Sequence, residues 1–204
     1  SGDLMWTNYG RPRENPGIDG YARAIAERAY QAYRTIEYRE SVPLAMAERE
    51  VRLRMRVPSE ERLAWAREVV AAMGDRPPRN QAEIYAREQL FLHEHPDRPV
   101  TLQAVRVGDL GIAAFPAEVF ALTGLKIKAA SPLPLTMNIE LANGEDGYIP
   151  PPEQHALGGY TTWACRTAGL EVEAEPKLVE AMLRMLERVA DTPRRSVRVV
   201  DGEY

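Results

Sequence analysis

The sequence contains very little cysteine, with a single residue, Cys165, among 204. One cysteine excludes an internal disulfide and any cysteine-rich zinc site. Its plainest interpretation is a small buried hydrophobe, and a nucleophilic role would need a histidine nearby in the folded chain. No apolar stretch approaches the roughly 20 residues that cross a bilayer. The chain opens at Ser1 with neither an initiator methionine nor a signal peptide, so we expect a processed or truncated product.

Positive charge is not in excess either. The 26 Lys and Arg residues against 30 Asp and Glu residues give a formal net charge of −4. No broad basic surface is implied, which argues against a nucleic-acid partner. The 45% hydrophobic and 27% charged fractions are ordinary for a soluble globular protein, so the length suits one large domain or part of a bigger one.

What the sequence does contain is a mixture of strand-like alternation and helical periodicity. Strict alternation along residues 47–57 predicts a half-buried strand, with Arg52, Arg54 and Arg56 on its solvated face. A Gly-Asp turn at residues 108–109 between two apolar runs predicts a β-hairpin. We therefore expect an α/β fold, a mixed sheet with flanking helices. The predicted strands are 47–57, 100–107, 110–115 and 135–141, and the predicted helices are 18–38, 59–74, 80–92, 118–130 and 175–191.

Local signals mark where several helices begin and end. Ser59 and Asn80 are expected as helix N-caps, and Gly74 is expected to end the first of these two helices. Along 175–191, apolar residues at helical spacing predict a helix face buried in the core. The stripe consists of Leu178, Met182, Met185, Leu186 and Val189.

The two ends of the chain give weaker signals. Residues 1–16 are rich in Gly, Pro and Asn and predict an ordered loop in which Trp6 and Tyr9 pack against other residues. Residues 192–204 predict either an added edge strand or a free tail.

The segment from Leu141 to Tyr160 is the most informative part of the chain. It is a long Gly-, Asn- and Pro-rich loop after a predicted strand, a common architecture for functional sites. Glu118 follows another strand, where α/β folds collect ligands, although an acid there also suits a helix N-terminus. Two strand ends thus make Glu118 and Tyr148 possible neighbours, and a carboxylate with a phenolate suits a cation such as zinc. A tyrosine ligand needs its pKa, ordinarily near 10, to be lowered by the metal.

The three histidines offer no obvious ligand set. His93 and His95 end a predicted helix, and side chains two residues apart do not share one helix face. They are typical of a polar helix C-terminus, and a metal site there would need an extended backbone. His155 is predicted to be exposed in the long loop, with an acid–base role as the alternative.

Several segments, in this order, resemble the neutral/alkaline (non-lysosomal) ceramidase family, specifically the second half of its zinc-dependent catalytic domain. Residues 108–118 are similar to the family's strand that ends in a Pro-x-Glu turn. Residues 141–150, with Asn143 four residues before Gly147-Tyr148, are similar to its Asn-x₄-Tyr loop, and 152–160 to its continuation. Ser1-Gly-Asp resembles a Gly-Asp segment midway through such proteins, and the resemblance is densest over 100–165.

The resemblance implies a role for particular residues. Glu118 and Tyr148 match two zinc ligands, and Tyr160 matches the catalytic tyrosine that hydrogen-bonds the substrate carbonyl and its oxyanion. Tyr160 and Asn143 are expected to bind substrate. The activity implied is zinc-dependent hydrolysis of the N-acyl amide of ceramide or a related lipid amide.

The resemblance also implies that this chain carries only part of the site. Residues 1–204 are expected to be the C-terminal part of a single catalytic domain, without the family's immunoglobulin-like C-terminal domain. Two histidine ligands and a catalytic histidine would come from an N-terminal half, so the isolated chain would be inactive. The family resemblance implies a secreted or periplasmic location.

Two other hypotheses remain at this stage. The first is a non-catalytic binding or structural module of the same fold. The second is an N-terminal-nucleophile hydrolase, in which the free amine of Ser1 acts as base for its own hydroxyl.

Overall fold

The computed structural model describes residues 2–4, 10–12 and 15–196. The predictions for Ser1 as a nucleophile, for the packing of Trp6 and Tyr9, and for 197–204 lie outside the described residues. No helix within the described ranges is both long and apolar enough to cross a membrane.

The smaller of two compact units, Leu4–Pro43, contains α1 (Gly17–Tyr33). This predicted helix is confirmed, with Asp19 in its first turn, although it ends at Tyr33 instead of Tyr38. No residue of α1 is buried, so its apolar stripe is exposed.

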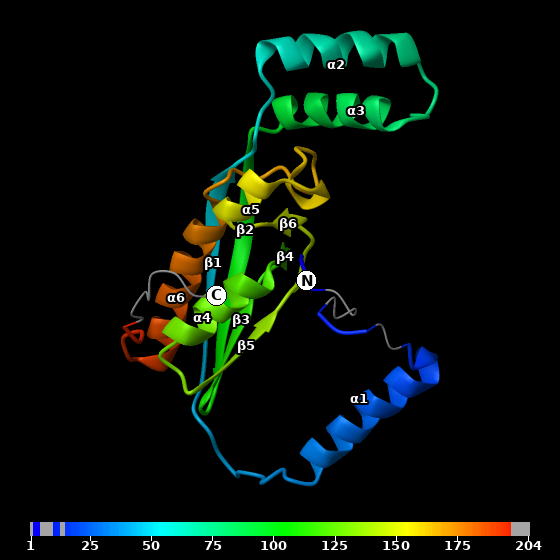
Figure 1. Ribbon diagram of the computed structural model, residues 1–204. Helices are drawn as coiled ribbons and strands as arrows, with labels where there is room; N and C mark the ends of the chain where they lie inside the picture. The colour runs from blue at the N-terminus through cyan, green and yellow to red at the C-terminus, as the bar shows by residue number, and fades with distance from the viewer. Residues whose placement is uncertain (1, 5–9, 13–14, 197–204) are drawn as a thin grey trace. The chain divides into compact units, whose positions relative to one another are not determined.

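The larger unit, Ser1–Asp3 with Leu44–Tyr204, is built on a four-stranded sheet in the order β1-β2-β3-β5 (Figure 1). The pairs β1–β2 and β2–β3 are antiparallel, whereas β3 and β5 run parallel. The predicted hairpin is confirmed, with Gly108 at a φ of 61° in its turn. A mixed sheet with flanking helices confirms the predicted α/β class. The strands are β1 (Leu44–Arg54), β2 (Asp97–Val107), β3 (Leu110–Ala114) and β5 (Leu135–Ile139).

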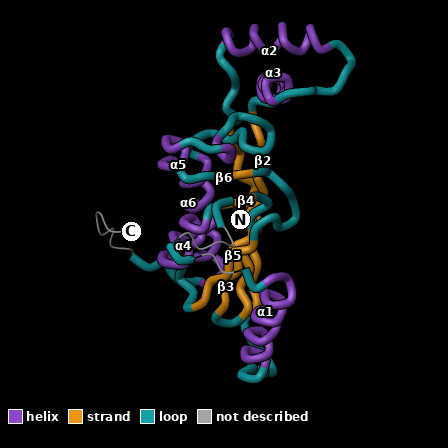
Figure 2. The backbone as a smooth tube through the Cα atoms, turned by 45° about the vertical axis from the view of Figure 1, so that its right-hand side comes forward, coloured by secondary structure: helices purple, strands orange, loops and turns teal. Residues whose placement is uncertain are grey.

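Two helices, α4 (Ala121–Ala130) and α6 (Ala174–Ala190), lie against one face of this sheet and enclose the core (Figure 2). α6 packs on β1, β2 and β3, and α4 packs on β5 and on α6. The predicted apolar stripe of α6 is confirmed, because all five of its side chains are buried. Full burial of one such side chain stabilises the fold by about 1.5–3 kcal/mol.

The opposite face of the sheet carries two rows of apolar side chains that cross all four strands, exposed on the edge strands β1 and β5 and partly buried on β3. In these rows Leu44 is 73% exposed and Leu135 62%, and Met46 and Met137 are more than half exposed. These side chains form a strip of apolar surface that is most exposed at the two edges of the sheet. We call it the open face; its rows are Leu44, Val107, Leu110 and Leu135, and Met46, Val105, Ile112 and Met137.

The solvated arginine face predicted for the first strand is only partly correct. Arg52 and Arg54 are exposed. The prediction for Arg56 is wrong, because its half-buried guanidinium donates to the carbonyl oxygens of Leu170, at 3.0 Å, and of Ala168. Strand β1 ends at Arg54, so alternation no longer fixes the direction of the Arg56 side chain.

Between β1 and β2 the chain forms a helical hairpin of α2 (Glu60–Met73) and α3 (Gln81–Glu94), drawn at the top of Figure 1. Both predicted N-caps are confirmed. The side chains of Ser59 and Asn80 each accept from the backbone N–H three residues on, at 3.2 and 3.0 Å. Gly74 ends α2 as predicted, with a φ of 58°.

The helix predicted over 118–130 begins later, at Ala121. Glu118 instead belongs to a short strand, since its N–H donates to the carbonyl oxygen of Gly147 at 2.8 Å. The carboxylate of Asp3 accepts from the N–H of Ala121 at 2.7 Å. Asp3 therefore supplies the helix N-terminal acid for which Glu118 was the sequence candidate.

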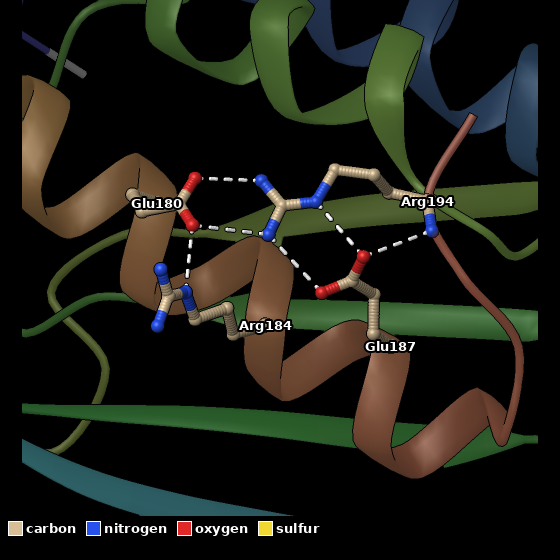
Figure 3. A network of polar contacts seen from close by, with 4 residues as sticks. All are labelled: Glu180, Arg184, Glu187 and Arg194. Atoms are coloured by element: carbon tan, nitrogen blue, oxygen red, sulfur yellow. Dashed lines mark hydrogen bonds and ion pairs between the residues drawn. The ribbon is translucent and has the colours of Figure 1, made fainter. Parts of the chain in front are cut away.

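An ion-pair network holds the residues after α6 against that helix (Figure 3). The guanidinium of Arg194 bridges Glu180, at 2.6 Å, and Glu187, at 2.9 Å. Its hydrogen bond, with that of Arg184, lowers the pKa of Glu180 to about 2. Arg194 is therefore held on α6, and the N–H of Arg195 donates to the carbonyl oxygen of Ala130 at the end of α4 at 2.9 Å. Residues 192–196 form neither the predicted edge strand nor a free tail.

Candidate active site

Beyond the carboxyl ends of β3 and β5, the chain forms a two-stranded parallel sheet of β4 (Glu118–Val119) and β6 (Tyr148–Ile149) (Figure 1). Glu118 is the direct partner of Tyr148 in the register of this pair. Paired residues of neighbouring strands present their side chains on the same face. The two ligands predicted from the sequence thus lie side by side.

The ring of Tyr160 completes a cluster of three oxygen-bearing side chains. The ring centroids of Tyr148 and Tyr160 lie 5.4 Å apart, edge to face, at an interplanar angle of 88°. The hydrogen bond to Tyr160, burial, and the charge of Glu118 together raise the pKa of Tyr148 to about 12. The phenol of Tyr148 is therefore protonated at neutral pH, while Tyr160, at 60% exposure, is open to solvent.

The position of Tyr148 depends on a close backbone approach one residue earlier. Gly147 has a φ of 73°, and a Cβ added there would lie 2.1 Å from the carbonyl oxygen of Thr167. That same oxygen accepts the N–H of Tyr148 at 2.8 Å. Glycine thus lets β6 fit between β4 and the segment that carries Thr167.

The position of Tyr160 depends on two further glycines. Gly158 and Gly159 have φ values of 80° and 97°, which L side chains rarely adopt. They lead into a single 3₁₀ turn, η1 (Tyr160–Thr162), in which the hydroxyl of Thr162 donates to the carbonyl oxygen of Gly159 at 2.7 Å. This turn presents the Tyr160 ring to Tyr148.

Asn143 lies on the same loop but is engaged elsewhere. Its φ is 60°, and its side-chain NH₂ donates to the amide oxygen of Gln103 on β2 at 2.6 Å. Asp146 anchors the loop nearby through an ion pair with Arg98 at 2.6 Å. These contacts show that Asn143 helps to hold the loop against β2. Its contact with substrate stays a prediction.

The histidines at the end of α3 do not join the cluster. A ring nitrogen of His95 lies 2.9 Å from the carbonyl oxygen of Phe91, and the two rings stack. His93 is in the last turn of α3, as predicted.

Two predictions about individual side chains were wrong. His155, in α5 (Pro152–Leu157), is partly buried instead of exposed. Burial, and next the charge of Arg56, lower its pKa, while Glu173 opposes the shift. Cys165 is partly exposed instead of buried, because it lies in the loop before α6, with its sulfur 3.4 Å from the hydroxyl of Thr167.

Glu118 and Tyr148 fit zinc as a partial ligand set. Carboxylate oxygens are common zinc ligands, and a phenol oxygen beside one adds a second donor. Catalytic zinc sites have three protein ligands. Across residues 2–4, 10–12 and 15–196, no three His, Cys, Asp or Glu side chains form a group that could hold a metal ion.

Sequence reasoning missed two residues that shape the site. Gly147 is needed for the close approach of β6 to Thr167. The only sequence signal for a turn there was a glycine directly before Tyr148 and Ile149. The N–H of Gly2 donates to the carbonyl oxygen of Val119 at 3.1 Å, which extends β4 on its other side. Nothing in the local sequence signals a contact over that separation.

The fold of the chain is similar to that of part of a ceramidase domain. The crystal structure of neutral ceramidase from Pseudomonas aeruginosa aligns with 96% of this chain at a TM-score of 0.55 and 15% identity. A second solved structure, a ceramidase complexed with C2, aligns with 51% of this chain at a TM-score of 0.40 and 17% identity.

The chain spans 37% of the length of the Pseudomonas aeruginosa protein and 17% of the other. No protein-family model and no curated protein matches the sequence. At 15% identity the alignment shows the fold alone, and a shared fold does not fix a shared activity.

Proposed function

We propose that this chain carries one side of the active site of a zinc-dependent amide hydrolase that acts on the N-acyl amide of ceramide or a related lipid amide. The observation that carries the proposal is the meeting of Glu118, Tyr148 and Tyr160. These three residues come from two strand ends and a separate turn. They are also the residues for which the resemblance to the ceramidase family implies a role as zinc ligand or oxyanion donor.

In this proposal Glu118 and Tyr148 are the zinc ligands that the chain contributes. Zinc, when bound, supplies Lewis-acid polarisation of a carbonyl and activation of a water molecule. Glu118 adds one negative charge to the ligand set. Because the pKa of Tyr148 is about 12, its phenol binds either as a neutral oxygen or by losing a proton that the cation displaces.

Tyr160 is the proposed oxyanion donor. Its hydroxyl is now engaged with Tyr148, and a ligand role for Tyr148 frees that hydroxyl to face the substrate. A hydrogen bond to the amide carbonyl oxygen strengthens as negative charge develops there in the transition state. The exposure of Tyr160 leaves room for a substrate carbonyl beside it.

The remaining zinc ligands and the base are proposed to come from another segment of the same domain, its N-terminal half. The open face supports this, because its two apolar rows need a covering surface. A segment that packs on β3 and β5 there would lie close to the carboxyl ends of these strands, where β4 and β6 follow.

The test uses the natural protein that contains this chain, loaded with zinc and given an N-acyl amide whose released fatty acid is measured. We expect Glu118→Gln to lower both zinc occupancy and activity, the latter by at least about 100-fold. Glu145→Gln, an exposed acid on the same long loop, should leave both unchanged. Full zinc occupancy and activity in Glu118→Gln would refute the proposal, and zinc binding without hydrolysis would favour the binding module.

A further inference from the structure

A cavity of about 330 Å³ lies between the helical hairpin and the segment that follows η1. Trp163 forms one wall, and its backbone N–H donates to the carbonyl oxygen of Tyr160 at 3.2 Å. The cavity wall and the proposed oxyanion donor therefore belong to one turn. The lining residues are Arg62 from α2, Tyr85 and Gln89 from α3, and Trp163 and Ala164.

The walls of the cavity suit an apolar or aromatic group. The rings of Tyr85 and Trp163 meet edge to face, with centroids 5.9 Å apart. Trp163 is 45% exposed, a large apolar surface left open beside a cavity. Pockets of this size, lined by aromatic rings with a few polar groups, are typical small-molecule sites.

Arg62 gives the cavity a positive charge. Its guanidinium stacks on Trp65, 3.9 Å from the ring centroid, which holds the side chain in place. Within the described ranges Arg62 has no ion pair with a carboxylate, whereas Arg166 pairs with Glu88 at 2.9 Å. Arg62 is thus an ordered cation available to an anionic ligand.

A polar side chain of the cavity, Gln89, is already held in place without a ligand. Gln89 is 5% exposed, and its side-chain NH₂ donates to the carbonyl oxygen of Ala164 at 2.9 Å. Arg166, which pairs with α3, stacks over the ring of Phe91 at 4.4 Å. These contacts tie the segment after η1 to α3, so a ligand would find the cavity formed and would lose less entropy on binding.

We propose that this cavity binds the carboxylate-bearing half of an N-acyl amino acid, with an apolar side chain packed against the paired rings of Tyr85 and Trp163 and the carboxylate at Arg62. The scissile amide would then lie toward Tyr160, in the same turn. Hydrolysis adds the hydroxyl of water to the acyl carbon and its proton to the nitrogen, which releases a carboxylic acid and a free amino acid. The link to catalysis rests on the proposed function, but the binding does not.

The test is a calorimetric titration of this chain, without zinc, with N-acetylphenylalanine and with its neutral carboxamide. We expect the carboxylate to bind at least tenfold more tightly than the carboxamide. Arg62→Gln should abolish this preference, and Arg67→Gln, an exposed arginine of the same helix outside the cavity, should keep it. Trp163→Ala should weaken both ligands, with circular dichroism showing that each variant is folded.

Failure of the carboxylate to bind, equal affinity for the two ligands, or an unchanged preference in Arg62→Gln would overturn the cavity proposal. Because no hydrolysis is measured, an inactive chain leaves this result valid. Conversely, zinc-dependent hydrolysis of other amides without N-acetylphenylalanine binding would remove the cavity proposal and leave the proposed function standing.

Discussion

Gly147→Ala is expected to destabilise the larger unit by about 3 kcal/mol or more, a large effect for one methyl group. The added Cβ would lie 2.1 Å from the carbonyl oxygen of Thr167, a backbone atom that cannot rotate away. The φ of 73° adds roughly 1–2 kcal/mol for any L side chain. The backbone shift would break the hydrogen bond from the N–H of Tyr148 to Thr167. It would also move the carbonyl oxygen of Gly147, which accepts from the N–H of Glu118, so the pairing of β4 with β6 would be weakened. Urea unfolding followed by circular dichroism measures the loss.

The matched control is Gly158→Ala, in the turn before Tyr160. Gly158 also has a positive φ, of 80°, but nothing lies within 4 Å of its missing Cβ. Only the conformational cost of roughly 1–2 kcal/mol remains there. If the two variants lose equal stability, the close approach of β6 to Thr167 is not what requires glycine at position 147.

Tyr160→Phe is expected to lower kcat of the zinc-loaded natural protein by about 10²–10³, with little change in KM. The substitution removes one hydroxyl, and the ring that packs on Tyr148 remains. The same change should shift the titration of Tyr148 to lower pH, because the hydrogen bond that the Tyr148 phenol donates to the Tyr160 oxygen is the largest cause of its raised pKa of about 12. Steady-state kinetics and the ultraviolet absorbance of tyrosinate measure the two effects.

Tyr38→Phe is the control, since Tyr38 is 85% exposed and belongs to the smaller unit. It should change neither kcat nor the titration of Tyr148. A Tyr160→Phe protein with normal kcat and normal zinc content would show that Tyr160 does not stabilise the transition state.

Local chemistry explains why some of the fold could be predicted. Ser59 and Asn80 cap their helices through bonds to residues three positions on, so a short stretch of sequence contains both partners. The stripe of α6 and the turn at Gly108 are likewise set within one element. Glu118 and Tyr148 were expected as neighbours because two successive strand ends of one sheet tend to meet at the same edge.

Contacts between distant segments explain what the sequence did not reveal. The start of α4 is set by Asp3, 118 residues away, and the burial of Arg56 depends on carbonyl groups more than 110 residues later. The amide of Asn143 is held by Gln103, 40 residues earlier, which no loop pattern indicates. In each case tertiary packing determines the partner, and the local periodicity of the sequence carries no information about it.

The position of bound zinc decides whether Glu118 and Tyr148 are metal ligands. Crystals of the zinc-loaded natural protein, measured at the zinc absorption edge, should place the ion about 2.0–2.2 Å from a carboxylate oxygen of Glu118, with the phenol oxygen of Tyr148 also in its coordination shell. Zinc bound instead at His93 and His95, or a Tyr148 whose phenol is still hydrogen-bonded to Tyr160 and lies outside the coordination shell of zinc, would contradict the proposed ligand set.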